Sequence, residues 1–92
     1  MSNVNETLEQ RGEVYGNFSQ GITLEAEILS LIKGRYYDQY SRDMDEWYVV
    51  AISKIVMKLS RLAVSPKHLD SWHDIAGYAV LVEQHLKENT NA

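Results

Sequence analysis

The chain has no cysteine, a single proline (Pro66) and no run that approaches the ~20 apolar residues of a membrane-spanning helix. Without cysteine, disulfides and thiolate zinc sites are excluded, and nothing indicates an oxidising compartment. The N-terminus lacks the basic region and apolar run of a signal peptide. These absences predict a cytoplasmic protein that does not associate with a membrane.

Positive charge is also in short supply. Nine Lys and Arg residues stand against thirteen Asp and Glu residues, which gives a formal net charge of -4. A general nucleic-acid binder needs a basic surface for its phosphate contacts, so we do not expect general nucleic-acid binding. A local basic pocket for one nucleotide remains compatible with this balance.

The composition otherwise fits a small globular domain. The 92 residues suffice for one domain near the lower size limit for an adequate core, and 45% of them are hydrophobic. Six Tyr and two Trp are many for this length. Domains this small often complete their burial by oligomerising, so we expect a homodimer or homotetramer.

Apolar residues recur at helical spacing and predict an all-α fold, a small antiparallel helical bundle of about four helices. Pro66 separates the last two helices, because the residue before a proline disfavours helix. Asp43 or Asp45 is expected to cap the start of the helix that follows, at about 45–64, and Phe18 is expected to pack inward. The single domain 1–92 should contain a short, irregular N-terminal segment (1–17) with a first helix at about 5–14. Further helices are expected at about 18–40, 45–64 and 67–87, followed by a frayed tail (88–92).

Asp70 and Asp74 are the first candidate ligands. At i and i+4 they project from one face of the last helix, within reach of one shared cation. Mg²⁺ prefers carboxylate oxygen and commonly leaves coordination positions to water and substrate phosphate. The alternative is structural, since acidic residues near a helix N-terminus stabilise it through the helix dipole.

Glu25 is the third candidate metal ligand. It lies in the apolar stripe of its helix, with Ile28 and Leu29 one turn further on. A carboxylate there should be paired, protonated or metal-bound, because burying it alone is costly. The alternative is a boundary residue whose carboxylate reaches solvent.

Lys54, Lys58 and Arg61 form a cationic stripe at i, i+4 and i+7. Beside metal-bound carboxylates, such cations would hold phosphate oxygens of a substrate. Alternatively they form a solvated face, or pair with Asp70 and Asp74 between helices. Tyr78 could stack on a nucleotide base, although an aromatic residue at this spacing is more often part of the core.

Three separated motifs resemble those of a group of small phage and prophage proteins. They are RGEVYGNF (11–18), KIVMKLSRL (54–62) and DSWHDIAGYA (70–79), and the resemblance extends from about Glu9 to Leu86. Those proteins are in turn distantly similar to MazG-like, all-α nucleoside triphosphate pyrophosphohydrolases and to phage nucleotide-modification-associated domains.

The resemblance to MazG implies a helical dimer or tetramer that binds Mg²⁺ through carboxylates on two helices. It also implies cleavage of an NTP or dNTP between the α- and β-phosphates. The family pattern is E-x-x-E on one helix and E-x-x-D on a later one. Here Ile28 stands where the second Glu would follow Glu25, and Asp70 and Asp74 are four residues apart rather than three.

Two hypotheses therefore stand. The chain is a Mg²⁺-dependent nucleotide pyrophosphohydrolase or a degenerate nucleotide-binding relative, with Glu25, Asp70 and Asp74 on the metal. Alternatively it is a non-catalytic phage module that binds a host protein. Aromatic residues around the second turn between helices would then anchor the interface, unless they only close one end of the core. They are Tyr36, Tyr37, Tyr40 and Trp47.

Overall fold

The computed structural model describes residues 4–90, without the side chains of residues 5, 6, 11–14 and 90. All secondary structure in this range is helical, which confirms the all-α prediction for the described residues. Residues 1–3 and 91–92, which belong to the predicted N-terminal segment and tail, lie outside that range. The helices are α1 (Val4–Tyr15), α2 (Phe18–Tyr40), α3 (Glu46–Val64) and α4 (Leu69–Thr90).

The two ends of the chain are more regular than expected. The helix predicted at about 5–14 is present as α1, and it is regular along its length. It packs against α2 and α3, and tertiary packing supplies most of the stability of a helix. At the other end α4 continues to Thr90, beyond the expected limit at 87. An i,i+4 ion pair at 3.2 Å between Lys87 and Glu83 supports this last part, as does a 2.7 Å hydrogen bond from Asn89 Nδ2 to the carbonyl oxygen of His85.

Side chains cap the two central helices at their starts. Asn17 accepts a 3.0 Å hydrogen bond from the backbone N–H of Gln20, at the start of α2. Of the two candidates for α3, Asp45 is the cap and accepts from the N–H of Trp47 at 2.8 Å.

The inward packing expected of Phe18 is wrong, because its side chain is 84% exposed. The neighbouring Gly16 makes the close approach to α3 instead. It has a φ of +82°, and a Cβ at this position would lie 2.7 Å from Cγ2 of Val64. Only glycine combines this backbone conformation with such a short contact.

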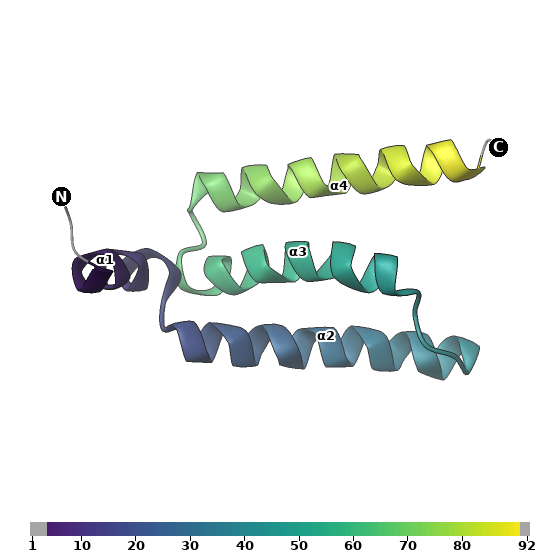
Figure 1. Ribbon diagram of the computed structural model, residues 1–92, viewed down its shortest axis with the longest axis horizontal. Helices are drawn as coiled ribbons and strands as arrows, with labels where there is room; N and C mark the ends of the chain where they lie inside the picture. Colours follow the sequence, from purple (N-terminus) through teal and green to yellow (C-terminus); the bar gives the residue numbers. More distant parts are fainter. Residues whose placement is uncertain (1–3, 91–92) are drawn as a thin grey trace.

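Helix α3 lies between α2 and α4 in one layer, and α1 extends from one end of that layer (Figure 1). The chain reverses direction in the turns after Tyr40 and after Val64. Over the described residues, α2 and α4 each pack against α3 and not against each other. The shape is accordingly elongated, with extents of 50 × 27 × 23 Å. The radius of gyration is 16.0 Å, where a compact domain of this length has about 12 Å.

The layer buries little apolar surface. Val56 and Leu62 are the buried hydrophobic residues among those described, and the buried polar residues are Lys58, Ser60 and Ser71. The chain exposes 7324 Å². A folded monomer of 10.6 kDa exposes about 5,500 Å², so the excess is about 1,900 Å². As a single copy, the chain leaves most of its hydrophobic side chains in contact with water.

Candidate functional site: a charged contact between two helices

An ion pair joins α3 to α4. The ammonium of Lys58 lies 2.8 Å from Oδ2 of Asp74, and the two side chains are 9% and 43% exposed. The turn between the helices brings them together, with the N–H of His68 donating to the carbonyl oxygen of Ser65 at 3.0 Å. Of the predicted ligands, Asp74 thus meets one of the predicted cations directly.

Positive charge surrounds Asp74 on more than one side. The hydrogen bond from Lys58 lowers the pKa of the Asp74 carboxyl below its ordinary value of 3.8, while burial acts in the opposite direction. The charges of Lys58, His73 and Arg61 lower this pKa further. The carboxylate is therefore held in its ionised form by the positive charge beside it.

Arg61 faces α1 as well as Asp74. Its guanidinium carbon lies 4.3 Å from the centre of the Tyr15 ring, a cation–π contact. Tyr15 in turn meets the ring of His68 edge-on, with the ring centres 5.6 Å apart. His68 Nδ1 lies 2.8 Å from Oγ of the fully buried Ser71. This chain of contacts fixes Arg61 at the junction of three helices.

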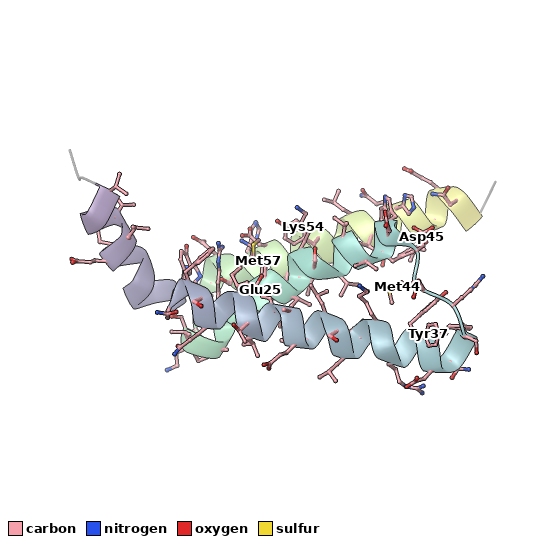
Figure 2. All side chains as sticks on the ribbon, turned by 60° about the horizontal axis from the view of Figure 1, so that its bottom comes forward. Glu25, Tyr37, Met44, Asp45, Lys54 and Met57 are labelled. Carbon is pink, nitrogen blue, oxygen red and sulfur yellow. The ribbon has the colours of Figure 1, made fainter. Side chains whose placement is uncertain are left out.

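Glu25 lies in the other contact of α3. Its Oε2 accepts a 3.1 Å hydrogen bond from the hydroxyl of Ser60, and Figure 2 shows its position on α2. Ser60 and Lys58 are two residues apart, so their side chains point about 200° apart around α3. Helix α3 therefore stands between Glu25 and the Lys58–Asp74 pair.

The predicted metal ligands do not converge within one chain. Among the described side chains, no group of three or more His, Cys, Asp or Glu residues could hold a metal ion. Asp70 is exposed in the first turn of α4. A Mg²⁺ ion here could therefore draw on Asp70 and Asp74, whereas Glu25 could join it only from another subunit.

The remaining predicted substrate residues lie on the same two helices. Lys54 is exposed and, with Glu46, Trp47, Val50 and Ala51, lines a hollow of about 530 Å³ on α3. Tyr78 is half-buried and follows Asp74 by one turn of α4. The structure thus gathers Lys58, Arg61 and Asp74, with Lys54 and Tyr78 one turn away along their helices.

The partner of Glu25 was missed by the sequence analysis, and so were the contacts of Tyr15 and Ser71. Ser60 follows the buried Val56 by four residues, so it continues the same stripe of α3. A small hydroxyl residue on an apolar stripe was the available signal. Ser71 lies between Asp70 and Trp72, and nothing in this local sequence indicates that its side chain is completely buried.

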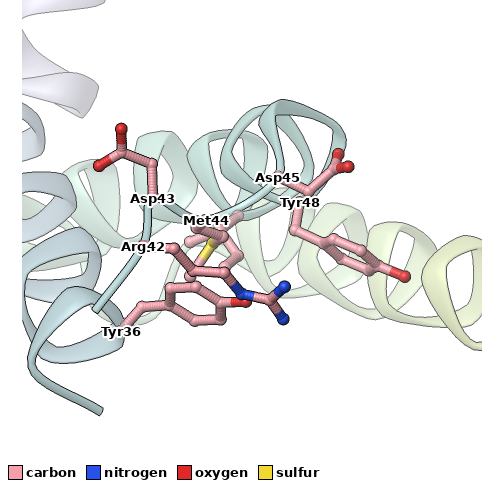
Figure 3. Close-up of a pocket in the computed structure, with 7 residues that line it drawn as sticks. Tyr36, Arg42, Asp43, Met44, Asp45 and Tyr48 are labelled. Atoms are coloured by element: carbon pink, nitrogen blue, oxygen red, sulfur yellow. The ribbon is translucent and has the colours of Figure 1, made fainter. Parts of the chain in front are cut away.

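A separate hollow of about 570 Å³ lies at the turn between α2 and α3. Figure 3 shows the guanidinium of Arg42 between the rings of Tyr36 and Tyr48, while the carboxylate of Asp43 points away. None of the predicted metal or substrate residues lines this hollow. The nearby Tyr37, Tyr40 and Trp47 side chains are 53%, 56% and 42% exposed, so they do not close the core completely.

Fold and contacts define a small all-α domain with an ion pair between α3 and α4 and many exposed hydrophobic side chains among its described residues. The chain belongs to the family described as a domain of unknown function, DUF6378, whose model matches residues 1–86. No curated protein and no solved structure is significantly similar to it. Among the described helices, none is both long and apolar enough to cross a membrane.

Proposed function

We propose that this protein is a phage-type relative of the MazG-like group that binds a nucleoside triphosphate with Mg²⁺, as a homo-oligomer in the host cytoplasm. The observation that supports the proposal most is the set of cations around Asp74. Lys58, His73 and Arg61 all lower the pKa of this single carboxyl. Lys58 and Arg61 place positive charge here although the chain has a net charge of -4, and such local positive charge favours a small polyanion as the ligand.

The carboxylates at this contact suit a metal ion that arrives with its nucleotide. Mg²⁺ is usually held by one or two protein carboxylates plus substrate phosphates and water. Asp70 is exposed and Asp74 is half-exposed, so both could contribute an oxygen. Bound Mg²⁺ would neutralise phosphate charge and polarise the phosphoryl group. Lys54 and Arg61 would hold the remaining phosphate oxygens, and Tyr78 would contact the base.

Titration with Mg²⁺, with a panel of NTPs and dNTPs, and with both together tests this proposal. We expect the melting temperature to rise with nucleotide and Mg²⁺ together and to change little with Mg²⁺ alone. Lys54→Gln should weaken binding by about tenfold, the loss of one charge-assisted hydrogen bond. Lys33→Gln, which removes an exposed charge from α2, should leave it unchanged.

Pyrophosphate release separates the two forms of the proposal. Release that depends on Mg²⁺ and is lost in Asp74→Asn would identify a pyrophosphohydrolase. A shift in melting temperature without release would identify a degenerate nucleotide-binding relative. If no nucleotide changes the melting temperature or is hydrolysed, the proposal is wrong.

The exposed apolar surface favours a second candidate, a non-catalytic helical module that binds a host protein. Sixteen large hydrophobic side chains are exposed among the described residues. If the chain neither binds nucleotide nor associates with itself, this surface needs a different protein to cover it. Sedimentation velocity combined with the nucleotide titration separates the two candidates.

A further inference from the structure

The side of α4 that faces away from α3 carries a second apolar stripe. Leu69, Trp72, Ala76 and Val80 follow one another at i, i+3, i+7 and i+11 and so share one face of the helix. Leu69 is 80% exposed, Trp72 51% and Val80 52%, and Ala76 is exposed as well. We call these four residues the outer stripe of α4.

The opposite side of α4 is already in use. It holds the fully buried Ser71, and Asp74 one turn away contacts α3 through Lys58. A helix that is apolar on a second face as well is normally buried on that face too. The outer stripe therefore needs a covering surface that a single chain does not provide.

Trp72 is suited to anchor such a surface. Its indole N–H donates a 2.8 Å hydrogen bond to the carbonyl oxygen of Pro66. The one polar atom of the side chain is thus satisfied within the chain, and the bond holds the half-exposed ring in one place. Burying this ring removes apolar area from water without stranding a hydrogen-bond donor, and Trp is enriched among the residues that dominate binding energy.

A small residue one turn from Trp72 allows another helix to approach closely. Ala76 is exposed and follows Trp72 by four residues, so the two side chains are neighbours on the same face. In an antiparallel pair of α4 helices centred on Ala76, Trp72 of one copy stands opposite Val80 of the other. Glu83 and Lys87 continue the same face beyond Val80, and their ion pair with each other marks the end of the apolar part of the stripe.

We propose that the outer stripe of α4 is the contact between two copies of this chain, packed about a two-fold axis near Ala76. The whole chain exposes about 1,900 Å² more than a compact monomer of its mass, which is more than the ~800 Å² that each partner buries in a standard stable interface. A second copy supplies an identical stripe, and such self-complementary contacts are the commonest in oligomers. The proposal specifies the oligomer of the proposed function and holds whether or not a nucleotide binds.

Sedimentation velocity without nucleotide tests the proposal on the full chain and three variants. The wild type should sediment as at least a dimer of the 10.6 kDa chain at micromolar concentration. Ala76→Glu places a charge at the centre of the stripe, and Val80→Glu places one opposite Trp72 of the other copy. Each should raise the dissociation constant at least a hundredfold. Leu31→Glu places the same charge at a 75% exposed leucine of α2 and should leave association unchanged.

Fluorescence reports on Trp72 directly in a Trp47→Phe background, where it is the one remaining tryptophan. Dilution through the dissociation constant should shift its emission to the red as the ring becomes more exposed. Circular dichroism checks that each variant keeps its helices, and Ala76→Glu carries the test if Val80→Glu unfolds. A monomeric wild type at 100 µM overturns the proposal, as does wild-type association in folded Val80→Glu or Ala76→Glu. Because the assay contains no nucleotide, this result would not contradict nucleotide binding, which the titration with Mg²⁺ and nucleotides tests separately.

Discussion

Helix α3 contacts α2 and α4 through different chemistry. Toward α2, the carboxylate of Glu25 accepts a hydrogen bond from the neutral hydroxyl of Ser60. Toward α4, the carboxylate of Asp74 accepts a hydrogen bond from the ammonium of Lys58, and His73 and Arg61 also lower its pKa. The comparison teaches that the residue of α3 opposite each carboxylate, Ser60 or Lys58, determines whether the contact is a hydrogen bond to a neutral group or an ion pair. Glu25 meets an uncharged partner, and Asp74 is part of a charged cluster.

The largest effect is expected at Lys58, because its side chain is 9% exposed. Lys58→Ala should lower the free energy of unfolding by about 2 kcal/mol, since it removes about three buried methylene groups. Lys58→Met keeps a stem of similar length and should cost less than about 1 kcal/mol, because the half-exposed Asp74 can hydrate. Urea unfolding of both variants measures the difference. Equal losses would mean that the charge, and not the packed stem, stabilises this contact.

A smaller effect is expected in the neutral contact. Ser60→Ala removes the hydroxyl that donates to Glu25 and should cost about 1 kcal/mol, the usual net value of one such hydrogen bond. Glu25→Gln keeps an acceptor oxygen at the same position and should cost less. Chemical denaturation reports both values. A loss at Ser60 as large as that of Lys58→Ala would remove the proposed difference between the two contacts.

The smallest effect should be the pH dependence of the charged contact. The pKa of Asp74 is lower in the folded chain than its ordinary value of 3.8. Its stabilising contribution is therefore complete above about pH 4 and is lost as the pH falls through the folded pKa. The stability of Asp74→Asn should decline less steeply than that of the wild type below pH 4, as measured by thermal unfolding from pH 6 to pH 2. Parallel curves would contradict the assignment.

Much of the fold follows from local patterns. The range of α2 and the break at Pro66 are those that the sequence predicts, because apolar periodicity and proline sterics act over a few residues. The helix at about 5–14 is predicted as well, but its regularity and the extra length of α4 are not, since packing and side-chain contacts stabilise them. The exposure of Phe18 is not predicted either, because it depends on a tertiary contact, the close approach of Gly16 to Val64 of α3.

The candidate site was predictable in part. The pairing of Lys58 with Asp74 follows from a cationic stripe, a short turn and an acid at the start of the next helix. The separation of Glu25 from Asp74 does not follow, because it depends on which side of α3 each neighbour occupies. Sequence spacing places residues around one helix and leaves the placement of other helices around it open.

By itself the sequence determined an all-α chain, its breaks and the residue types that α3 and α4 bring together, since each depends on local spacing and charge. Only the tertiary structure decided that α3 stands between Glu25 and Asp74 and that the layer leaves α4 apolar on its outer face. The physical reason is that a helix can bury one face on either side of its neighbour with similar local energy. Packing of the whole chain selects between those arrangements, and here it leaves the outer stripe of α4 open to a second copy.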